Sequence, residues 1–293
     1  MRVLIMADME GVSGIAAWDQ VNGGAPMFEE GRRLYTEEVN AAVRGARAAG
    51  ATDVVVVDCH GAGKDWTFNS LVPDLIDPDC TWVTRHPWGR YTEMFDEKAE
   101  PPPADAAAPT DAAVIPGGGR CDVAVMVAMH ARAGTPDGVL CHTISTTTWR
   151  DLWFNDTCVG EFGINAALCG HHGVPVAAIT GDEATCREGR DLLGGGLAAV
   201  AVKKGLGRYS ARHLPPARAR GRIEAGVAAA LRDRGRWPAP WVPARPTTIT
   251  VDLSTVDSAN QFRGKKGVEI VDPLKVVSRG ADWMAAWDNF WGW

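Results

Sequence analysis

Short apolar runs that each end next to acidic or histidine residues limit what this sequence can fold into. The runs and the polar residues that follow them are Met1–Ala7 before Asp8 and Glu10, Val54–Val57 before His60, and Val123–Met129 before His130. Runs of this length and composition are typical of buried strands. In an open α/β layer, the carboxyl ends of parallel strands meet at one edge of the sheet, where ligands bind. We therefore expect these polar residues to converge on one edge of a sheet.

Segments with helical spacing alternate with the predicted strands. They include Glu29–Ala49, Glu183–Leu193 and Pro216–Arg234. This alternation predicts an α/β fold with a mostly parallel sheet flanked by helices.

A smaller α+β lobe is predicted at the C-terminal end. Its strands are expected at Thr247–Leu253 and Gly267–Val271, followed by a helix from Ala281. We expect residues 1–200 to form the metal-binding catalytic domain, and residues 201–293 to form a C-terminal lobe that takes part in oligomerisation. The tryptophans near the C-terminus are expected to pack in the core or to form a subunit contact.

Composition excludes several classes of protein. The chain has 293 residues and a net charge of −6, which gives no indication of a nucleic-acid partner. No apolar stretch approaches the length of a membrane span, and no signal-peptide pattern precedes the first strand. The seven cysteines lack C-x-x-C spacing, which favours reduced thiols and a cytoplasmic location.

The acidic pair has two interpretations. Asp8 and Glu10 are two positions apart, so a strand would direct both carboxylates to one face, where they repel each other unless a cation lies between them. Taken alone, the pair would be a solvated strand end. The two histidines at other strand ends, and Glu161 in the first turn of a predicted helix, favour a shared site.

The loop from His130 to His142 contains a second histidine. His142 could carry protons beside a metal or could simply hydrogen-bond within the loop, and the spacing favours neither interpretation. Asp58 is expected to orient His60 or to cap a loop, and Cys59 and Cys141 are expected to pack in the interior.

Four groups of residues together resemble the DppA-type zinc D-aminopeptidase family. They are Asp8-Met9-Glu10-Gly11, Asp58-Cys59-His60, His130-Ala131-Arg132-Ala133 with Thr135-Pro136, and Asn155 to Ala166, which matches N-D-x-x-V-G-E-x-G-x-N-A. The order of these motifs is that of the family. The resemblance covers nearly the whole chain.

The resemblance implies a role for each matched residue. Asp8 would bridge two zinc ions and Glu10 would bind one of them, while the remaining ligands would be His60, His130 and Glu161. The catalytic residue would be His142. This donor set also suits Mn²⁺ or Co²⁺. Lys203 and Arg208 match charged positions in the family, and each could contact substrate or lie on a solvated face.

The resemblance also implies the activity. We expect a dinuclear zinc metallopeptidase that releases N-terminal amino acids, D-configured by analogy, from short peptides or amides by metal-hydroxide attack on the carbonyl. A related dinuclear amidohydrolase acting on a non-peptide amide or D-amino-acid conjugate is the alternative, and an inactive binding protein is a second one. The family forms homo-oligomeric rings, with a decamer as the expected size.

Three departures from the family pattern concern substrate choice. Met6 replaces the motif serine, Asp137 is an extra residue between the two histidines, and a Pro/Ala-rich segment is inserted near residues 101–110.

Overall fold

The computed structural model describes residues 1–63, 67–85, 93–95 and 119–291. The Pro/Ala-rich segment near 101–110 lies outside these residues. The first sheet has the strand order β3-β2-β1-β4-β7-β8-β9. The strands are β1 (Arg2–Ala7), β2 (Asp53–Asp58), β3 (Thr81–Val83), β4 (Val123–Met129), β7 (Val176–Asp182), β8 (Ala198–Gly207) and β9 (Ser210–His213). Only β9 is antiparallel to its neighbour.

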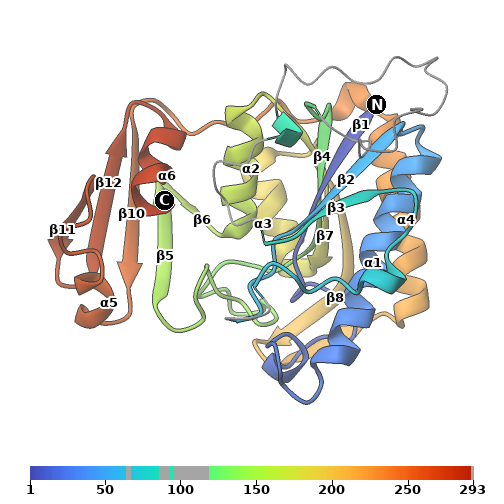
Figure 1. Cartoon of the computed structure of the whole chain (residues 1–293), viewed down its shortest axis with the longest axis horizontal. Coiled ribbons are helices and arrows are strands. Elements are labelled where there is room, and N and C mark those ends of the chain that lie inside the picture. The colour runs from blue at the N-terminus through green and yellow to red at the C-terminus, as the bar shows by residue number, and fades with distance from the viewer. Residues whose placement is uncertain (64–66, 86–92, 96–118, 292–293) are drawn as a thin grey trace.

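Helices cover both faces of this sheet (Figure 1). The helices are α1 (Phe28–Ala48) and α4 (Pro216–Arg232) on one face, and α2 (Glu161–His171) and α3 (Glu183–Leu193) on the other. The strands are buried on both sides because alternate residues enter different cores: Val3 and Ile5 pack in the α1–α4 core, and Leu4 packs in the opposite one. Short 3₁₀ helices occur at Trp18–Gln20, Pro73–Leu75, Glu93–Phe95 and Arg234–Arg236.

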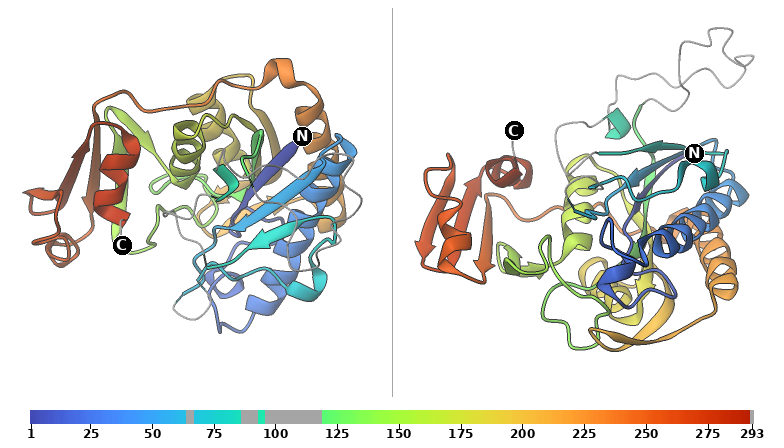
Figure 2. Two further views of the ribbon diagram at one scale, coloured as in Figure 1. Left: turned by 45° about the horizontal axis from the view of Figure 1, so that its top comes forward. Right: turned by 60° about the horizontal axis from the view of Figure 1, so that its bottom comes forward.

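A second, antiparallel sheet lies to one side of the first (Figure 2). Its strands, in spatial order, are β11 (Val268–Asp272), β12 (Lys275–Gly280), β10 (Thr247–Leu253), β5 (Trp149–Phe154) and β6 (Thr157–Val159). The helices of this unit are α5 (Val256–Asn260) and α6 (Trp283–Trp291). The mostly parallel, helix-flanked sheet and the smaller α+β unit confirm the predicted fold class.

Tryptophans of α6 form the core of this smaller unit. Trp283 and Trp287 are buried and stack with ring centroids 5.5 Å apart, and Phe154 of β5 meets both rings edge-on. Trp283 and Trp287 therefore pack in the core, which is one of the two roles expected for the C-terminal tryptophans.

The two sheets do not divide the chain at residue 200. That position lies inside β8, and the first sheet and its helices continue through α4 to Arg232. Strands β5 and β6, which precede residue 200, pair instead with β10 in the second sheet. The smaller unit is therefore built from two separate stretches of the chain, because β10 needs β5 as its hydrogen-bonding partner on one side.

Candidate metal centre

The register of three strands brings the predicted site residues to one edge of the first sheet. Ala7, the last residue of β1, is level with Asp58 of β2 and with Val127 of β4. Residues just beyond these positions therefore emerge together. The strand order also reverses here, since β2 and β4 flank β1, and such a switch point is the usual ligand site of an open α/β sheet.

Two groups of donor atoms meet at this edge. The Nδ1 atom of His60 lies 3.3 Å from Asp8 Oδ1 and 3.2 Å from Glu10 Oε2. The Nε2 atom of His130 lies 3.2 Å from Asp8 Oδ2 and 3.5 Å from Glu161 Oε1. The two oxygens of Asp8 thus face different groups of donors.

These separations match the requirements of zinc. Ligands bound at 2.0–2.2 Å in a tetrahedron lie roughly 3.3–3.6 Å from one another. All five side chains are buried, yet Asp8 Oδ2, Glu10 Oε2 and His130 Nε2 have no hydrogen-bond partner among the described residues. Buried polar atoms without hydrogen bonds are costly, so three of them within one cluster of donor atoms indicate that a cation belongs there. The residues present therefore fit the metal.

Main-chain carbonyls orient both imidazoles. His60 Nε2 lies 2.8 Å from the carbonyl of Val21, and His130 Nδ1 lies 2.9 Å from the carbonyl of Ala131. A ring nitrogen facing a carbonyl must donate, which leaves the other nitrogen of each ring as a donor atom for a metal.

The charged groups of the cluster strongly shift one another's pKa values. Burial alone would raise the pKa of Asp8, but its contacts with His130 and His60 outweigh burial and hold that pKa well below its usual range. Burial disfavours charged imidazoles, but the nearby carboxylates Glu10 and Glu161 raise the pKa of His60 and of His130, respectively, well above normal. Protons on the histidines can thus balance the buried carboxylates, and a divalent cation would displace them.

His142 lies beside this cluster. Its ring stacks on that of His130 with centroids 4.1 Å apart, and its Nε2 atom lies 3.7 Å from Glu161 Oε1. Its Nδ1 atom is 2.9 Å from the carbonyl of Leu140, so the Nε2 atom carries the free electron pair when the ring is neutral. Burial and the neighbouring His130 lower the pKa of His142, which favours this neutral form.

The structure thus brings all six predicted residues together. The donor atoms of Asp8, Glu10 and His130 lie within 4.8 Å of one another, as do those of His130, His142 and Glu161. The second group leaves His142 available either as a ligand or as a proton carrier.

Asp58 shapes the turn that carries His60. Its carboxylate accepts hydrogen bonds from the main-chain N–H groups of His60 and Leu71, each at 3.1 Å, and from the Tyr35 hydroxyl. This agrees with the expected role in capping a loop. Cys59 is buried and burial raises its thiol pKa far above normal, as expected for a packing residue.

Lys203 has a structural role that the sequence did not reveal. The side chain is buried, and its ammonium donates to the carbonyls of Glu10, Val12 at 2.9 Å and Ile15 at 2.8 Å. It therefore fixes the loop that carries Glu10 and does not lie on a solvated face. The sequence signals were a lysine directly after the apolar run Ala198–Val202 and its match to a charged position in the family, and neither indicated this role.

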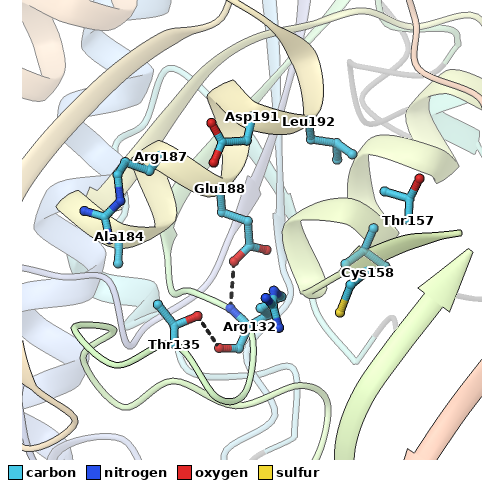
Figure 3. A pocket seen from close by; sticks show the side chains of 10 residues that line it. Arg132, Thr135, Thr157, Cys158, Ala184, Arg187, Glu188, Asp191 and Leu192 are labelled. Carbon is cyan, nitrogen blue, oxygen red and sulfur yellow. Dashed lines mark hydrogen bonds between the residues drawn. The ribbon is translucent and has the colours of Figure 1, made fainter.

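Glu188 of α3 is a second supporting residue that sequence reasoning missed. Its Oε2 atom accepts a hydrogen bond from the Arg132 N–H at 2.8 Å, inside the pocket of Figure 3. A Cβ atom on Gly160 would come within 2.7 Å of Glu188 Oε1, so this carboxylate also packs against the residue before Glu161. Glu188 thus links the segments that carry His130 and Glu161.

Two departures from the family pattern lie away from the donor atoms. Met6 is buried, and its sulfur lies 3.8 Å from the Cys169 sulfur. Asp137 forms an exposed ion pair with Arg187 at 2.7 Å. The first departure therefore changes core packing, and the extra residue is accommodated at the surface.

Comparisons with known proteins agree with this geometry. A family model described as D-aminopeptidase matches residues 1–96 and 113–291. A D-aminopeptidase of Bacillus subtilis (strain 168) is 28% identical over 272 residues, which cover 92% of this chain and 88% of the relative. A solved structure, described as the Zn-dependent D-aminopeptidase DppA from Bacillus subtilis, a self-compartmentalizing protease, matches with a TM-score of 0.84 and 26% identity over 99% of this chain and 96% of that chain. The chain therefore belongs to the M55 peptidase family, whose members are described as D-aminopeptidases.

Proposed function

We propose that this chain is a zinc-dependent aminopeptidase that releases N-terminal, D-configured amino acids from short peptides. The observation that carries the proposal is the cluster of buried donor atoms on Asp8, Glu10 and His130, which lack hydrogen bonds among the described residues and lie at the switch point of the sheet. Membership of the family and the Zn-dependent relative support it.

We further propose two zinc ions per subunit. His60 and Glu10 approach one oxygen side of Asp8, and His130 and Glu161 approach the other. Asp8 would then be shared by the two ions, and the remaining four side chains would divide evenly between them. Manganese or cobalt would suit the same oxygen and nitrogen donors.

The chain's own residues would handle the proton. When bound, zinc supplies a Lewis acid that polarises the scissile carbonyl and activates water at neutral pH. The Nε2 atom of His142 is free to accept a proton and return it to the leaving amine, since Nδ1 is held by the carbonyl of Leu140. A cluster carboxylate could bind the free amino group of the substrate, which would explain aminopeptidase action.

Substrate turnover tests the activity. D-alanyl and L-alanyl p-nitroanilides, together with D-Ala-D-Ala, should separate a D-aminopeptidase from the alternative amidohydrolase. We expect zinc-dependent release of D-alanine from the D-configured substrates. Absence of D-alanine release by the fully zinc-loaded protein would contradict the proposal.

The variant His142→Ala tests the proton-carrying role. We expect a loss of kcat of about 100- to 10,000-fold, typical of general acid–base residues, with zinc content unchanged near two per subunit. His171→Ala, at the far end of α2, is the matched control. Loss of one zinc equivalent from His142→Ala would instead make His142 a ligand.

Assembly and location remain predictions. The solved relative is described as self-compartmentalizing, and we propose that this chain also forms a homo-oligomer, with a decamer expected. Analytical ultracentrifugation measures this directly. No helix among the described residues has both the length and the apolar character needed to cross a membrane. The cytoplasmic location is a prediction supported by seven cysteines that are all free thiols.

A further inference from the structure

The tip of the hairpin between β8 and β9 is attached to the loop that carries His142. The carbonyl of Arg208, at this tip, accepts a hydrogen bond from the Leu140 N–H at 2.8 Å. The carbonyl of Leu140 in turn holds His142 Nδ1. The position of Arg208 relative to the metal centre is therefore set by main-chain contacts.

Two aromatic rings hold the side chain of Arg208. Its Cζ atom lies 5.5 Å from the ring centroid of Trp18 and 5.6 Å from that of Tyr209. The Trp18 indole N–H donates to the Tyr209 hydroxyl at 3.4 Å, which joins the two rings. Cation–π contacts of this kind hold a guanidinium in place while leaving its N–H groups free to bind an anion.

Among the residues that the structure describes, the Arg208 guanidinium forms no ion pair with a carboxylate, and its Nε atom is buried with no hydrogen-bond partner. The side chain is only half-buried, so solvent and ligands can reach it. In a chain with a net charge of −6, an unpaired and preorganised cation next to the site is suited to an anionic part of the substrate.

The distances limit which part of a substrate can reach Arg208. The Trp18 ring is also 5.5 Å from the His142 ring, so Arg208 Cζ lies no more than about 11 Å from His142. One extended residue spans about 3.3–3.6 Å. A guanidinium–carboxylate pair adds about 4 Å between its two carbon atoms. Because about 11 Å is the upper limit, at most about two residues after the scissile carbonyl fit between the site and Arg208.

We propose that Arg208 binds the C-terminal carboxylate of the substrate. This inference rests on the proposed aminopeptidase function. It assigns Arg208 to substrate binding, so its loss should raise KM for free acids and remove the preference for them over substrates that lack the carboxylate.

A pair of substrates that differ only in the terminal charge provides the test. We compare kcat/KM for D-Ala-D-Ala and for its C-terminal amide, with the zinc-loaded wild-type protein. A charge-assisted contact predicts a preference for the free acid of about 10- to 100-fold, expressed mainly in KM. Equal kcat/KM for acid and amide would overturn the inference, and this measurement needs no variant.

Variants then identify the residue responsible. Arg208→Met should abolish the preference, so that kcat/KM for the acid becomes equal to that for the amide. Arg208→Lys should restore only part of the preference, because lysine lacks the bidentate geometry. Arg212→Met, an exposed arginine on the adjacent strand, is the matched control and should retain the full preference.

The outcomes are distinguishable. Loss of activity on both substrates to the same extent in Arg208→Met would contradict carboxylate binding. If the zinc-loaded wild-type protein hydrolyses neither substrate and also releases no D-alanine from D-alanyl p-nitroanilide, the proposed function itself fails. Hydrolysis of both at equal rates removes only the role of Arg208.

Discussion

Gly11 offers a direct test of how the metal centre is held. This residue follows Glu10, and its N–H donates to the carbonyl of Ala128 at 2.8 Å. A Cβ atom added at Gly11 would lie 2.2 Å from the carbonyl oxygen of Met129 and 2.3 Å from the carbonyl carbon of Ala128. The loop that carries Glu10 and the strand end that carries His130 are thus in backbone contact.

The expected size of the effect follows from these distances. Ordinary contacts of a Cβ atom begin near 3.4 Å, so Gly11→Ala must separate the two segments by roughly 1 Å. Metal sites tolerate deviations of only about 0.2 Å in ligand distance. The variant therefore cannot keep Glu10 and His130 in place together, and we expect at least about a 100-fold fall in kcat/KM.

Zinc binding is the decisive measurement for Gly11→Ala. Zinc content after dialysis and competition with a chromophoric chelator should show weaker binding, together with a lower melting temperature. The control is Gly221→Ala in α4, where a Cβ atom meets nothing within 4 Å. It should leave zinc affinity unchanged and stabilise the helix by up to about 1 kcal/mol. Wild-type zinc affinity and melting temperature in Gly11→Ala would refute the reasoning.

Two further substitutions test the buried charges behind the site. Burial raises the pKa of Glu38 to about 7, so its stabilising contribution is complete below about pH 4.5 and is lost as the pH rises through about 7. Glu38→Gln should therefore have the same free energy of unfolding as the wild type at pH 4 and a value about 3 kcal/mol higher at pH 8, as measured by urea denaturation. A difference between the two proteins that does not vary with pH would contradict this. Lys203→Met leaves three buried carbonyls without their hydrogen-bond donor. This variant should lower the free energy of unfolding by about 2–4 kcal/mol and weaken zinc binding about 10- to 100-fold. The exposed neighbour Lys204→Met is the control for both measurements, and equal behaviour of the two variants would remove Lys203 from the support of the Glu10 loop.

The place of the site could be predicted because its signal is local. His60 and His130 each follow an apolar run, and parallel strands must end at a common edge. In the structure, Ala7 is level with Asp58 and with Val127, so the ends of these three strands do meet at one edge. The helices α1, α3 and α4 were predicted within a few residues because their apolar spacing is strong.

Partners far apart in the sequence could not be predicted in this way. Lys203 binds carbonyls about 190 residues earlier, and no local pattern marks those acceptors. Strand β5, with its mixed sequence Trp149–Phe154, lacks a clear alternation, and its partner β10 begins almost 100 residues later. For the same reason, the boundary expected at residue 200 does not coincide with the division between the sheets.

The pairing of β5 with β10 has a consequence for the order of folding. Glu161 follows β6, and β6 is held by β5, whose other edge is satisfied only by residues 247–253. During synthesis, a ribosome-bound chain that ends before β10 leaves β5 with an open edge, and the Glu161 donor rests on an incomplete sheet. The sheet beside Glu161 is therefore completed only after residues 247–253 have emerged from the ribosome.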